Sequence, residues 1–187
     1  MNTEESHQRP NLEFASKDGE MNFKQLMVKD TEDLFNLINE SEESKAHLSQ
    51  FGDTTAEKYT EQDKLRESIL FPPNPKRLRL AIRSKEQGDA IIGSINLTPS
   101  DQNPRRAEIG YWLGHRYAGQ RKGYMQRSVE ALTDAAFLSG NFDELYAEVV
   151  EGNTASAKVL EKAGYTFAGT KLNDKKQTLL IYTKTYP

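Results

Sequence analysis

A short basic segment in the second half of the chain has the composition of an anion-binding loop. It runs through Arg121, Lys122 and Gly123, and a helix is predicted to begin at Tyr124. The first N–H groups of a helix lack acceptors inside it, and the helix dipole is positive at this end, so a phosphate satisfies both. The basic side chains add charge, and the glycine lets the backbone approach a ligand closely. The segment therefore predicts a phosphate site.

The elements on either side of this segment can hold it in place. Residues 107–113 (AEIGYWL) are predicted as a strand, and the apolar residues that follow the loop recur at helical spacing: Met125, Val129, Leu132 and Ala136. The phosphate-binding patterns G-x-x-x-x-G-K-[ST] and G-x-G-x-x-G are both absent. A nucleotide loop of either kind is therefore not expected.

A second candidate segment, at Asn153 and Ser156, opens another predicted helix. Taken alone, these residues are an ordinary helix start. Asparagine is a preferred N-cap, and a serine three positions later lies in the first turn. Gly164 is suited to end the same helix.

Composition excludes several classes of protein. With 187 residues and no cysteine, the chain can form one domain but no disulfide, thiolate zinc site or cysteine nucleophile. The net charge of −3 argues against direct nucleic-acid binding, and the three scattered histidines argue against a metal site. Neither a membrane span nor a signal peptide is recognisable. We therefore expect a soluble cytoplasmic protein, a monomer or homodimer without membrane contact.

The order of predicted elements indicates the fold class. Residues 1–21 are polar and lack periodicity, so they are expected to form a flexible leader before a single domain at 22–187. The predicted strands are 23–28, 78–83, 90–97, 107–113, 145–150, 165–168 and 178–185, and the predicted helices follow a cap at 30–33, span 59–70 and 124–139, and follow 152–154. This order predicts an α+β fold around a central mixed, mostly antiparallel sheet flanked by helices.

A basic cluster marks the first strand after the proline-rich segment 72–75: Lys76, Arg77, Arg79 and Arg83. It could contact an acidic substrate or RNA. Charges that alternate along a strand of this kind usually mark its solvated face, which is the expectation here.

Three segments together resemble the GNAT superfamily of acetyl-CoA-dependent N-acetyltransferases. They are residues 108–113 (EIGYWL), 120–125 (QRKGYM) and 151–165 (EGNTASAKVLEKAGY). They are most similar to the RimJ/RimL-type branch, which acetylates the N-terminal α-amino groups of ribosomal proteins. The resemblance follows the order of elements from residue 23 to residue 185, and its specificity lies in 107–170.

The resemblance implies a GNAT fold and an acyltransferase that moves acetyl directly from acetyl-CoA to a primary amine, preferably a protein N-terminal α-amino group. The alternatives are a small-molecule amine (a polyamine, amino sugar or amino acid) and a non-catalytic CoA-binding module. The absence of cysteine favours direct transfer over an acetyl-enzyme. No metal is implied.

The resemblance also assigns residues to the acetyl-CoA site. The pantetheine arm would contact the backbone of Trp112, Leu113 and Gly114, and Asn153 would contact it too. The pyrophosphate loop would comprise Gly119, Gln120, Arg121, Lys122, Gly123, Tyr124 and Met125. This loop is about two residues longer than the common form. Either Gly119 or Gln120 can therefore take its first position.

Acetyl transfer also needs a base for the amine and an acid for the thiolate. Glu108 is the first candidate base, because a carboxylate near an apolar surface has a raised pKa. Its alternative role is a surface ion pair with Arg105 or Arg106. His115 or a water chain could serve as base instead. Many superfamily members use a tyrosine as acid where this chain has Leu160, so the resemblance assigns that role to Ser156.

Overall fold

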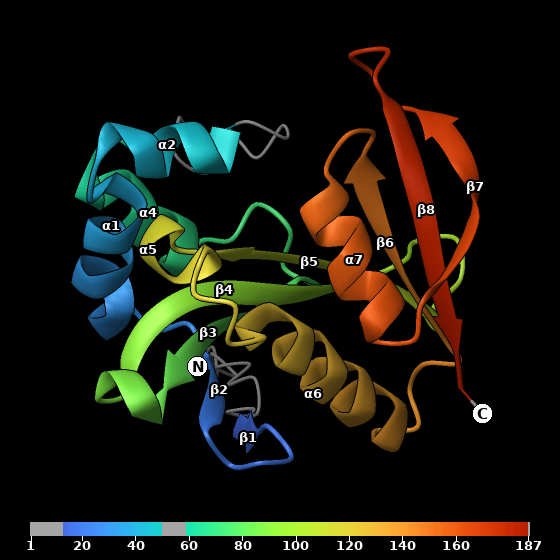
Figure 1. The fold of residues 1–187 in the computed structure, drawn as a ribbon, viewed down its shortest axis with the longest axis horizontal. Coiled ribbons are helices and arrows are strands. Elements are labelled where there is room, and N and C mark those ends of the chain that lie inside the picture. The colour runs from blue at the N-terminus through green and yellow to red at the C-terminus, as the bar shows by residue number, and fades with distance from the viewer. Residues whose placement is uncertain (1–12, 50–58, 187) are drawn as a thin grey trace, which may run out of the picture.

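The computed structural model describes residues 13–49 and 59–186, which form one eight-stranded sheet with helices on both faces (Figure 1). The strand order is β1-β2-β3-β4-β5-β6-β8-β7. The strands are β1 (Glu13–Ala15), β2 (Met21–Gln25), β3 (Leu78–Ser84), β4 (Ala90–Pro99), β5 (Arg106–Leu113), β6 (Glu144–Val150), β7 (Thr166–Leu172) and β8 (Thr178–Thr185). All neighbours are antiparallel except β5 and β6. The predicted α+β fold is confirmed.

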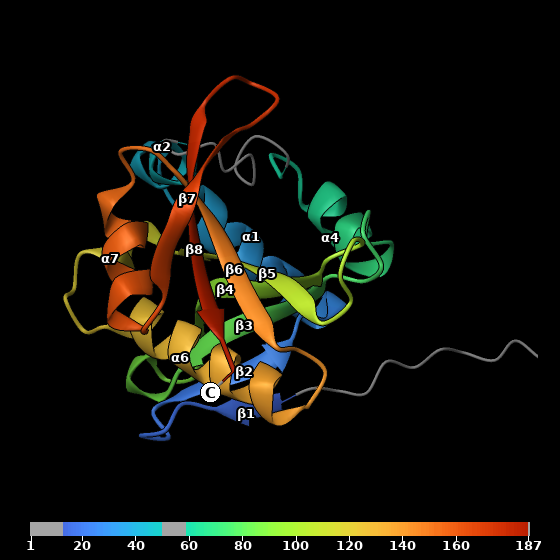
Figure 2. The same cartoon turned by 90° about the vertical axis from the view of Figure 1, so that its right-hand side faces the viewer.

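The helices connect these strands on either side of the sheet. They are α1 (Thr31–Asn39), α2 (Glu42–Ser49), α4 (Gln62–Leu70), α5 (His115–Ala118), α6 (Tyr124–Leu138) and α7 (Thr154–Lys162), with 3-10 turns η1 (Val28–Asp30) and η2 (Lys85–Gln87). In Figure 1, α6 crosses one face of the sheet, and α1 and α4 lie on the other side. Figure 2 shows β6, β8 and β7 side by side.

The N-terminal part of the sheet differs from the expectation. Strand β1 lies inside the segment expected to be a leader, and it pairs with β2 through the register Phe14–Phe23. Residues 1–12 lie outside the described part of the chain. The first predicted strand, 23–28, is shifted, because residues 28–30 turn into η1. Helix α2 was not predicted, because its mostly polar sequence has no apolar stripe.

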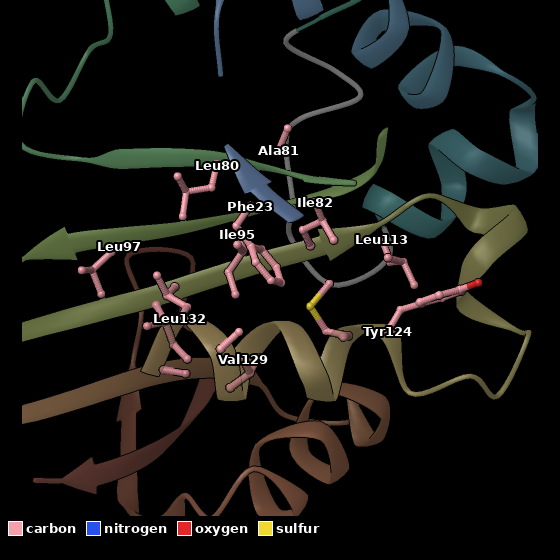
Figure 3. Close-up of a cluster of buried hydrophobic side chains, with 14 of the residues drawn as sticks. Phe23, Leu80, Ala81, Ile82, Ile95, Leu97, Leu113, Tyr124, Val129 and Leu132 are labelled. Carbon is pink, nitrogen blue, oxygen red and sulfur yellow. The ribbon is translucent and has the colours of Figure 1, made fainter. Parts of the chain in front are cut away.

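The apolar face of the sheet packs on α6. Side chains that alternate along β3 and β4, including Leu80, Ile95 and Leu97, are buried against Val129 and Leu132 of α6 (Figure 3). Because successive strand residues point to opposite faces, the residues between them must face the α1 and α4 side. This alternation places the polar side chains of the candidate site on the α1 and α4 side of the sheet.

The residues on that second face form cross-strand rows. Arg79 is opposite Asn96 in β4, and Asn96 is opposite Gly110 in β5. In the next row Thr98 is opposite Glu108. Neighbours in such a row share one face of the sheet, so this side of β3, β4 and β5 is polar and only partly covered.

One ion pair of the predicted basic cluster is structural. Arg83 donates from Nη2 to Oδ1 of Asp30 (2.7 Å), and both side chains are largely buried. The second carboxylate oxygen of Asp30 accepts the N–H of Met27 at 2.9 Å. Asp30, expected to cap α1 through its side chain, instead fastens the start of that helix to β3. The predicted solvated position of Arg83 is therefore wrong.

Candidate active site

Strands β5 and β6 separate after a short parallel start. They pair only from Arg106–Glu144 to Glu108–Tyr146, although β5 continues to Leu113. On its other edge β5 stays paired with β4 as far as Leu113. In the described structure, the edge of β5 that faces the gap therefore has no strand partner beyond Glu108. Its backbone N–H and C=O groups are available to an extended ligand, as at any open sheet edge.

The end of this open edge is fixed by close packing. A Cβ placed on Gly114 would lie 2.4 Å from Cδ1 of Leu37 in α1, so no larger residue fits there without movement. The side chain of Leu113 is buried and that of Trp112 is half-buried. Leu113 and Gly114 therefore lie in packed surroundings, and the N–H of Gly114 already donates to the carbonyl of Ile92 at 2.9 Å.

The predicted anion-binding loop is open at the start of α6. Gly123 has a φ of 65° and Arg121 a φ of 55°, both left-handed. No atom lies within 4 Å of a Cβ placed on Gly119 or Gly123. The side chains of Tyr124 and Met125 are buried, so only their backbone can reach a ligand. Backbone N–H groups at a helix start are the donors that a phosphate accepts.

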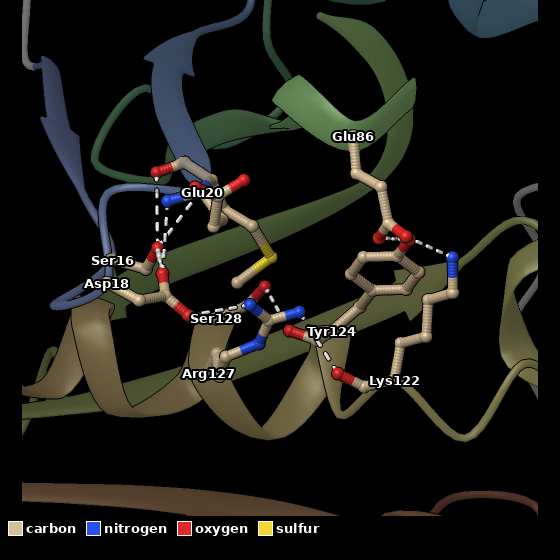
Figure 4. A network of polar contacts seen from close by, with 9 residues as sticks. Ser16, Asp18, Glu20, Glu86, Lys122, Tyr124, Arg127 and Ser128 are labelled. Atoms are coloured by element: carbon tan, nitrogen blue, oxygen red, sulfur yellow. Dashed lines mark hydrogen bonds and ion pairs between the residues drawn. The ribbon is translucent and has the colours of Figure 1, made fainter. Parts of the chain in front are cut away.

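Two side chains of this loop already have partners. The Lys122 ammonium forms an ion pair with the carboxylate of Glu86 in η2, and the Tyr124 hydroxyl donates to the same carboxylate at 2.8 Å (Figure 4). These two contacts lower the pKa of Glu86. Gln120 donates from Nε2 to the carbonyl of Arg116 at 2.9 Å. Arg121 is exposed and forms no ion pair with the described residues.

A brace for the loop comes from a residue that the sequence analysis did not select. Arg127 donates from Nη2 to the carbonyl of Lys122 (3.0 Å) and from Nη1 to Oδ2 of Asp18 (2.7 Å). Asp18 is held in turn by the Ser16 hydroxyl and the Glu20 N–H, as Figure 4 shows. The Ser16 hydroxyl and then Arg127 hold the pKa of Asp18 well below its usual value. No motif marks this arginine, and Asp18 lies in the expected leader.

Asn153 and Ser156 are connected at the start of α7. The side-chain oxygen of Asn153 accepts the N–H of Ser156 at 3.1 Å, which is the N-cap contact expected from the residues alone. The Tyr111 hydroxyl donates to the carbonyl of Ser156 at 3.2 Å and so links β5 to α7 across the gap. The Ser156 side chain also interacts with the Tyr111 hydroxyl, and this contact partly offsets the rise that burial causes in the pKa of Tyr111.

Glu108 lies where β5 and β6 begin to separate. Its expected surface partners are engaged elsewhere, because Arg105 pairs with Asp143 and Arg106 with Glu144. The half-buried carboxylate has a raised pKa, first because of burial and then because of the negative charge of Glu148. Glu108 therefore does not form the alternative surface ion pair with Arg105 or Arg106.

Glu148 was missed by the sequence analysis. It follows Tyr146, the partner of Glu108 in β6, by two residues and thus shares its face. An open cleft of about 350 Å³ lies between Glu108, Glu148 and the turn between β7 and β8. Lys171 of β7 pairs with Glu148 beside it. Leu145, Ala147 and Val149 of β6 are buried, so the alternation of the strand places Glu148 on the opposite face.

His115, the alternative candidate base, does not lie near Glu108. It begins α5, is exposed, and follows Glu108 by seven residues. An extended strand rises about 3.3 Å per residue, so the two backbones lie about 20 Å apart. The described residues contain no group of three or more metal-ligating side chains. None of the described helices has the length and apolar character needed to cross a membrane.

Comparison of the sequence with known proteins finds acetyltransferases. The model of the acetyltransferase (GNAT) domain family matches residues 21–166. The uncharacterized N-acetyltransferase p20 of Bacillus licheniformis is 37% identical over 91 residues, covering 49% of this chain and 49% of that protein. The putative ribosomal N-acetyltransferase YdaF of Bacillus subtilis (strain 168) is 29% identical over 148 residues, covering 77% of this chain and 76% of that protein. The match to p20 thus spans about half of its length.

Solved structures show the same fold at low identity. The ribosomal-protein-S5-alanine acetyltransferase of Vibrio fischeri has a TM-score of 0.77 at 18% identity, over 94% of this chain and 97% of that one. The microcin C7 self-immunity acetyltransferase MccE, in complex with acetyl-CoA and AMP, has a TM-score of 0.72 at 22% identity, over 89% and 93%. The resemblance noted in the sequence is confirmed by the family match, which covers well over half of the chain: this protein belongs to the GNAT acetyltransferase family.

Proposed function

We propose that this protein transfers acetyl from acetyl-CoA directly to a primary amine, preferably the N-terminal α-amino group of a protein. Family membership supports the reaction. The preference for a protein N-terminus is supported by likeness to YdaF, described as a putative ribosomal N-acetyltransferase, and to a ribosomal-protein-alanine acetyltransferase.

The residues present fit an acetyl-CoA molecule at the gap between β5 and β6. The open loop at Gly119–Gly123 and the N–H groups that begin α6 suit a pyrophosphate. The open edge of β5 up to Leu113 suits the pantetheine amides, and Asn153 lies across the gap from it. When bound, acetyl-CoA supplies the acetyl group as a thioester.

Two side chains carry the proton transfers in this proposal. The carboxylate of Glu108 accepts the proton that the acceptor amine loses, and its raised pKa suits a base working near neutral pH. The hydroxyl of Ser156 donates to the sulfur of the departing thiolate. A backbone N–H near Leu113 donates to the carbonyl oxygen on which negative charge develops.

The observation that carries the proposal is the position of Glu108, half-buried at the fork of the strands and beside an open cleft. A thiol-release assay with acetyl-CoA tests it, using a set of short peptides with free N-termini beside spermidine, glucosamine and free amino acids. We expect release with peptides. Release with the small amines alone would overturn the choice of acceptor. Binding of acetyl-CoA without release for any amine would indicate a binding module.

A further inference from the structure

Two arginines, one just before β3 and one at its start, form no ion pair with a described carboxylate. Most described arginines form an ion pair with an acidic side chain: Arg83, Arg105, Arg106, Arg116 and Arg127. The described arginines without such a pair are Arg66, which is exposed on α4, Arg121 of the loop, and Arg77 and Arg79. Lys76, the remaining member of the predicted basic cluster, pairs with Asp101. The pair Arg77 and Arg79 therefore stands out on the polar face.

Arg79 is the more unusual of the two, because it is partly withdrawn from solvent. Burial lowers its pKa below the usual value. Its Nη1 donates to the carbonyl of Ser68 (3.2 Å) and to the hydroxyl of Ser68 (3.3 Å), and the Tyr59 hydroxyl is a further neutral partner. A desolvated cation without a counter-ion is costly. An anion from outside the chain would remove that cost. The predicted solvated position is wrong for Arg79.

A small hollow lies beside Arg77 and Arg79. It measures about 30 Å³ and is lined by Arg77 and Arg79 together with Gln25, Ser68 and neighbouring apolar residues. A single water needs roughly 10–15 Å³ on this measure, so the hollow holds about two water-sized groups. That size matches the two oxygens of a carboxylate. Two guanidinium groups supply the charge-assisted hydrogen bonds that carboxylates accept best.

This hollow lies on the same side of the sheet as the proposed base. The Nε of Arg77 donates to the hydroxyl of Thr98 at 3.0 Å, and Thr98 is the cross-strand neighbour of Glu108. Adjacent strands are about 4.8 Å apart, so the guanidinium of Arg77 rests one strand away from Glu108. Arg77 already acts electrostatically on the Glu108 carboxylate.

We propose that Arg77 and Arg79 receive a carboxylate of the acceptor, so that the preferred acceptor is an α-amine followed within two residues by an acidic side chain. This inference rests on the proposed function and narrows it. One or two extended residues span about 3.5–7 Å, and the acidic side chain adds further reach. Such an acceptor can place its amine at Glu108 and its carboxylate in the hollow. Arg77 and Arg79 are then specificity residues.

The test compares C-terminally amidated peptides whose only possible carboxylate is at position 2 or 3: Ser-Asp-Ala-Ala, Ser-Ala-Asp-Ala and their Asn counterparts. Thiol release gives kcat/KM for the wild type and for Arg77→Gln, Arg79→Gln and Arg79→Lys. Arg66→Gln is the matched control, since it removes an unpaired arginine outside the hollow. We expect an Asp preference of about 10- to 100-fold at one of the two positions, carried by KM. We expect Arg79→Gln to lose most of it and Arg66→Gln to keep it.

A second measurement is independent of turnover. Calorimetry with the N-acetylated forms of the same peptides should show tighter binding of the Asp form to the wild type and equal binding of both forms to Arg79→Gln. Acetyl-CoA titration of each variant verifies the fold. Equal affinity of Asp and Asn peptides for the wild type, or a preference that survives in Arg79→Gln, would overturn this inference. Absence of thiol release despite acetyl-CoA binding would instead overturn the proposed function.

Discussion

The ammonium of Lys122 and the carboxylate of Glu86 form an ion pair at the entrance to the proposed pyrophosphate loop. The two side chains come from the loop before α6 and from the turn between β3 and β4, and both are partly exposed. A protein carboxylate thus pairs with a cation that was predicted to meet phosphate. A phosphate at this loop would therefore compete with Glu86 for the Lys122 ammonium.

The first prediction concerns this competition. In Glu86→Gln the ammonium of Lys122 no longer has a charged partner, so acetyl-CoA should bind more tightly. Solvent screens exposed ion pairs, so the Kd should fall by no more than a few-fold. Calorimetric titration measures it, with Lys122→Met, expected to bind more weakly, as the control. Weaker binding by Glu86→Gln would show that Glu86 positions Lys122 and does not compete for it.

The second prediction concerns the brace below the loop. Arg127→Gln removes both the donor to the Lys122 carbonyl and the partner of Asp18. The loop then loses its fixed shape, and the Kd for acetyl-CoA should rise several-fold. Asp18→Asn should have a smaller effect in the same direction, because Arg127 keeps its bond to the carbonyl. Unchanged affinity in both variants would show that the loop holds its shape without them.

The third prediction uses the raised pKa of Glu108. Since only the carboxylate form accepts a proton, kcat/KM of the wild type should increase as the pH rises through that pKa. Glu108→Gln should lower kcat by about 10²- to 10⁴-fold and abolish this limb of the pH profile. Glu151→Gln, an exposed residue just after β6, is the control. A Glu108→Gln variant with near-normal kcat would remove Glu108 from the role of base.

The raised pKa of Glu108 also affects the folding stability of the protein. The folded protein resists ionisation of Glu108, whereas the unfolded chain ionises it at the ordinary value of 4.5. Folding stability is therefore lost as the pH rises from that value through the higher folded pKa. Glu108→Gln should consequently have a Tm at neutral pH at or above that of the wild type. A clear decrease in Tm would mean that the carboxylate makes a stabilising contact.

The fourth prediction distinguishes the role of Asn153, which caps α7, from that of Ser156, which lies in the first turn of this helix. Asn153 caps the helix, so Asn153→Ala should cost about 1 kcal/mol of stability. Ser156→Ala removes only a side-chain contact with Tyr111, so it should lower Tm less than Asn153→Ala does while lowering kcat tenfold or more. Thermal unfolding and thiol release on both variants check this. Normal kcat in Ser156→Ala would exclude its hydroxyl as the proton donor.

The strongly patterned part of the chain was predictable. Strand β8 begins and ends where expected, and β5, α6 and β6 lie within one residue of their predicted limits, because alternation and helical spacing were unambiguous there. Strand β1 and helix α2 were missed, since three residues or a mostly polar helix give no periodic signal. Tertiary contacts, and not local sequence patterns, stabilise β1 and α2.

The site was predictable only where a local pattern marks it. The glycine-containing loop and the Asn153 cap follow from short-range rules. The brace of Arg127 on Asp18 and the pairing of Lys122 with Glu86 join residues 109 and 36 positions apart. Such contacts depend on the register of the whole sheet. The burial of Arg79 likewise depends on a distant element, because its guanidinium contacts Ser68 of α4. The local pattern of β3 is that of an ordinary amphipathic strand and does not reveal this contact.

The most direct test is mass spectrometry of a Ser-Asp-Ala-Ala amide after incubation with the wild-type protein and acetyl-CoA. We expect one added acetyl group, located on the α-amine, and a strongly reduced yield with Glu108→Gln. An unmodified peptide in the presence of protein that demonstrably binds acetyl-CoA would contradict the proposed activity.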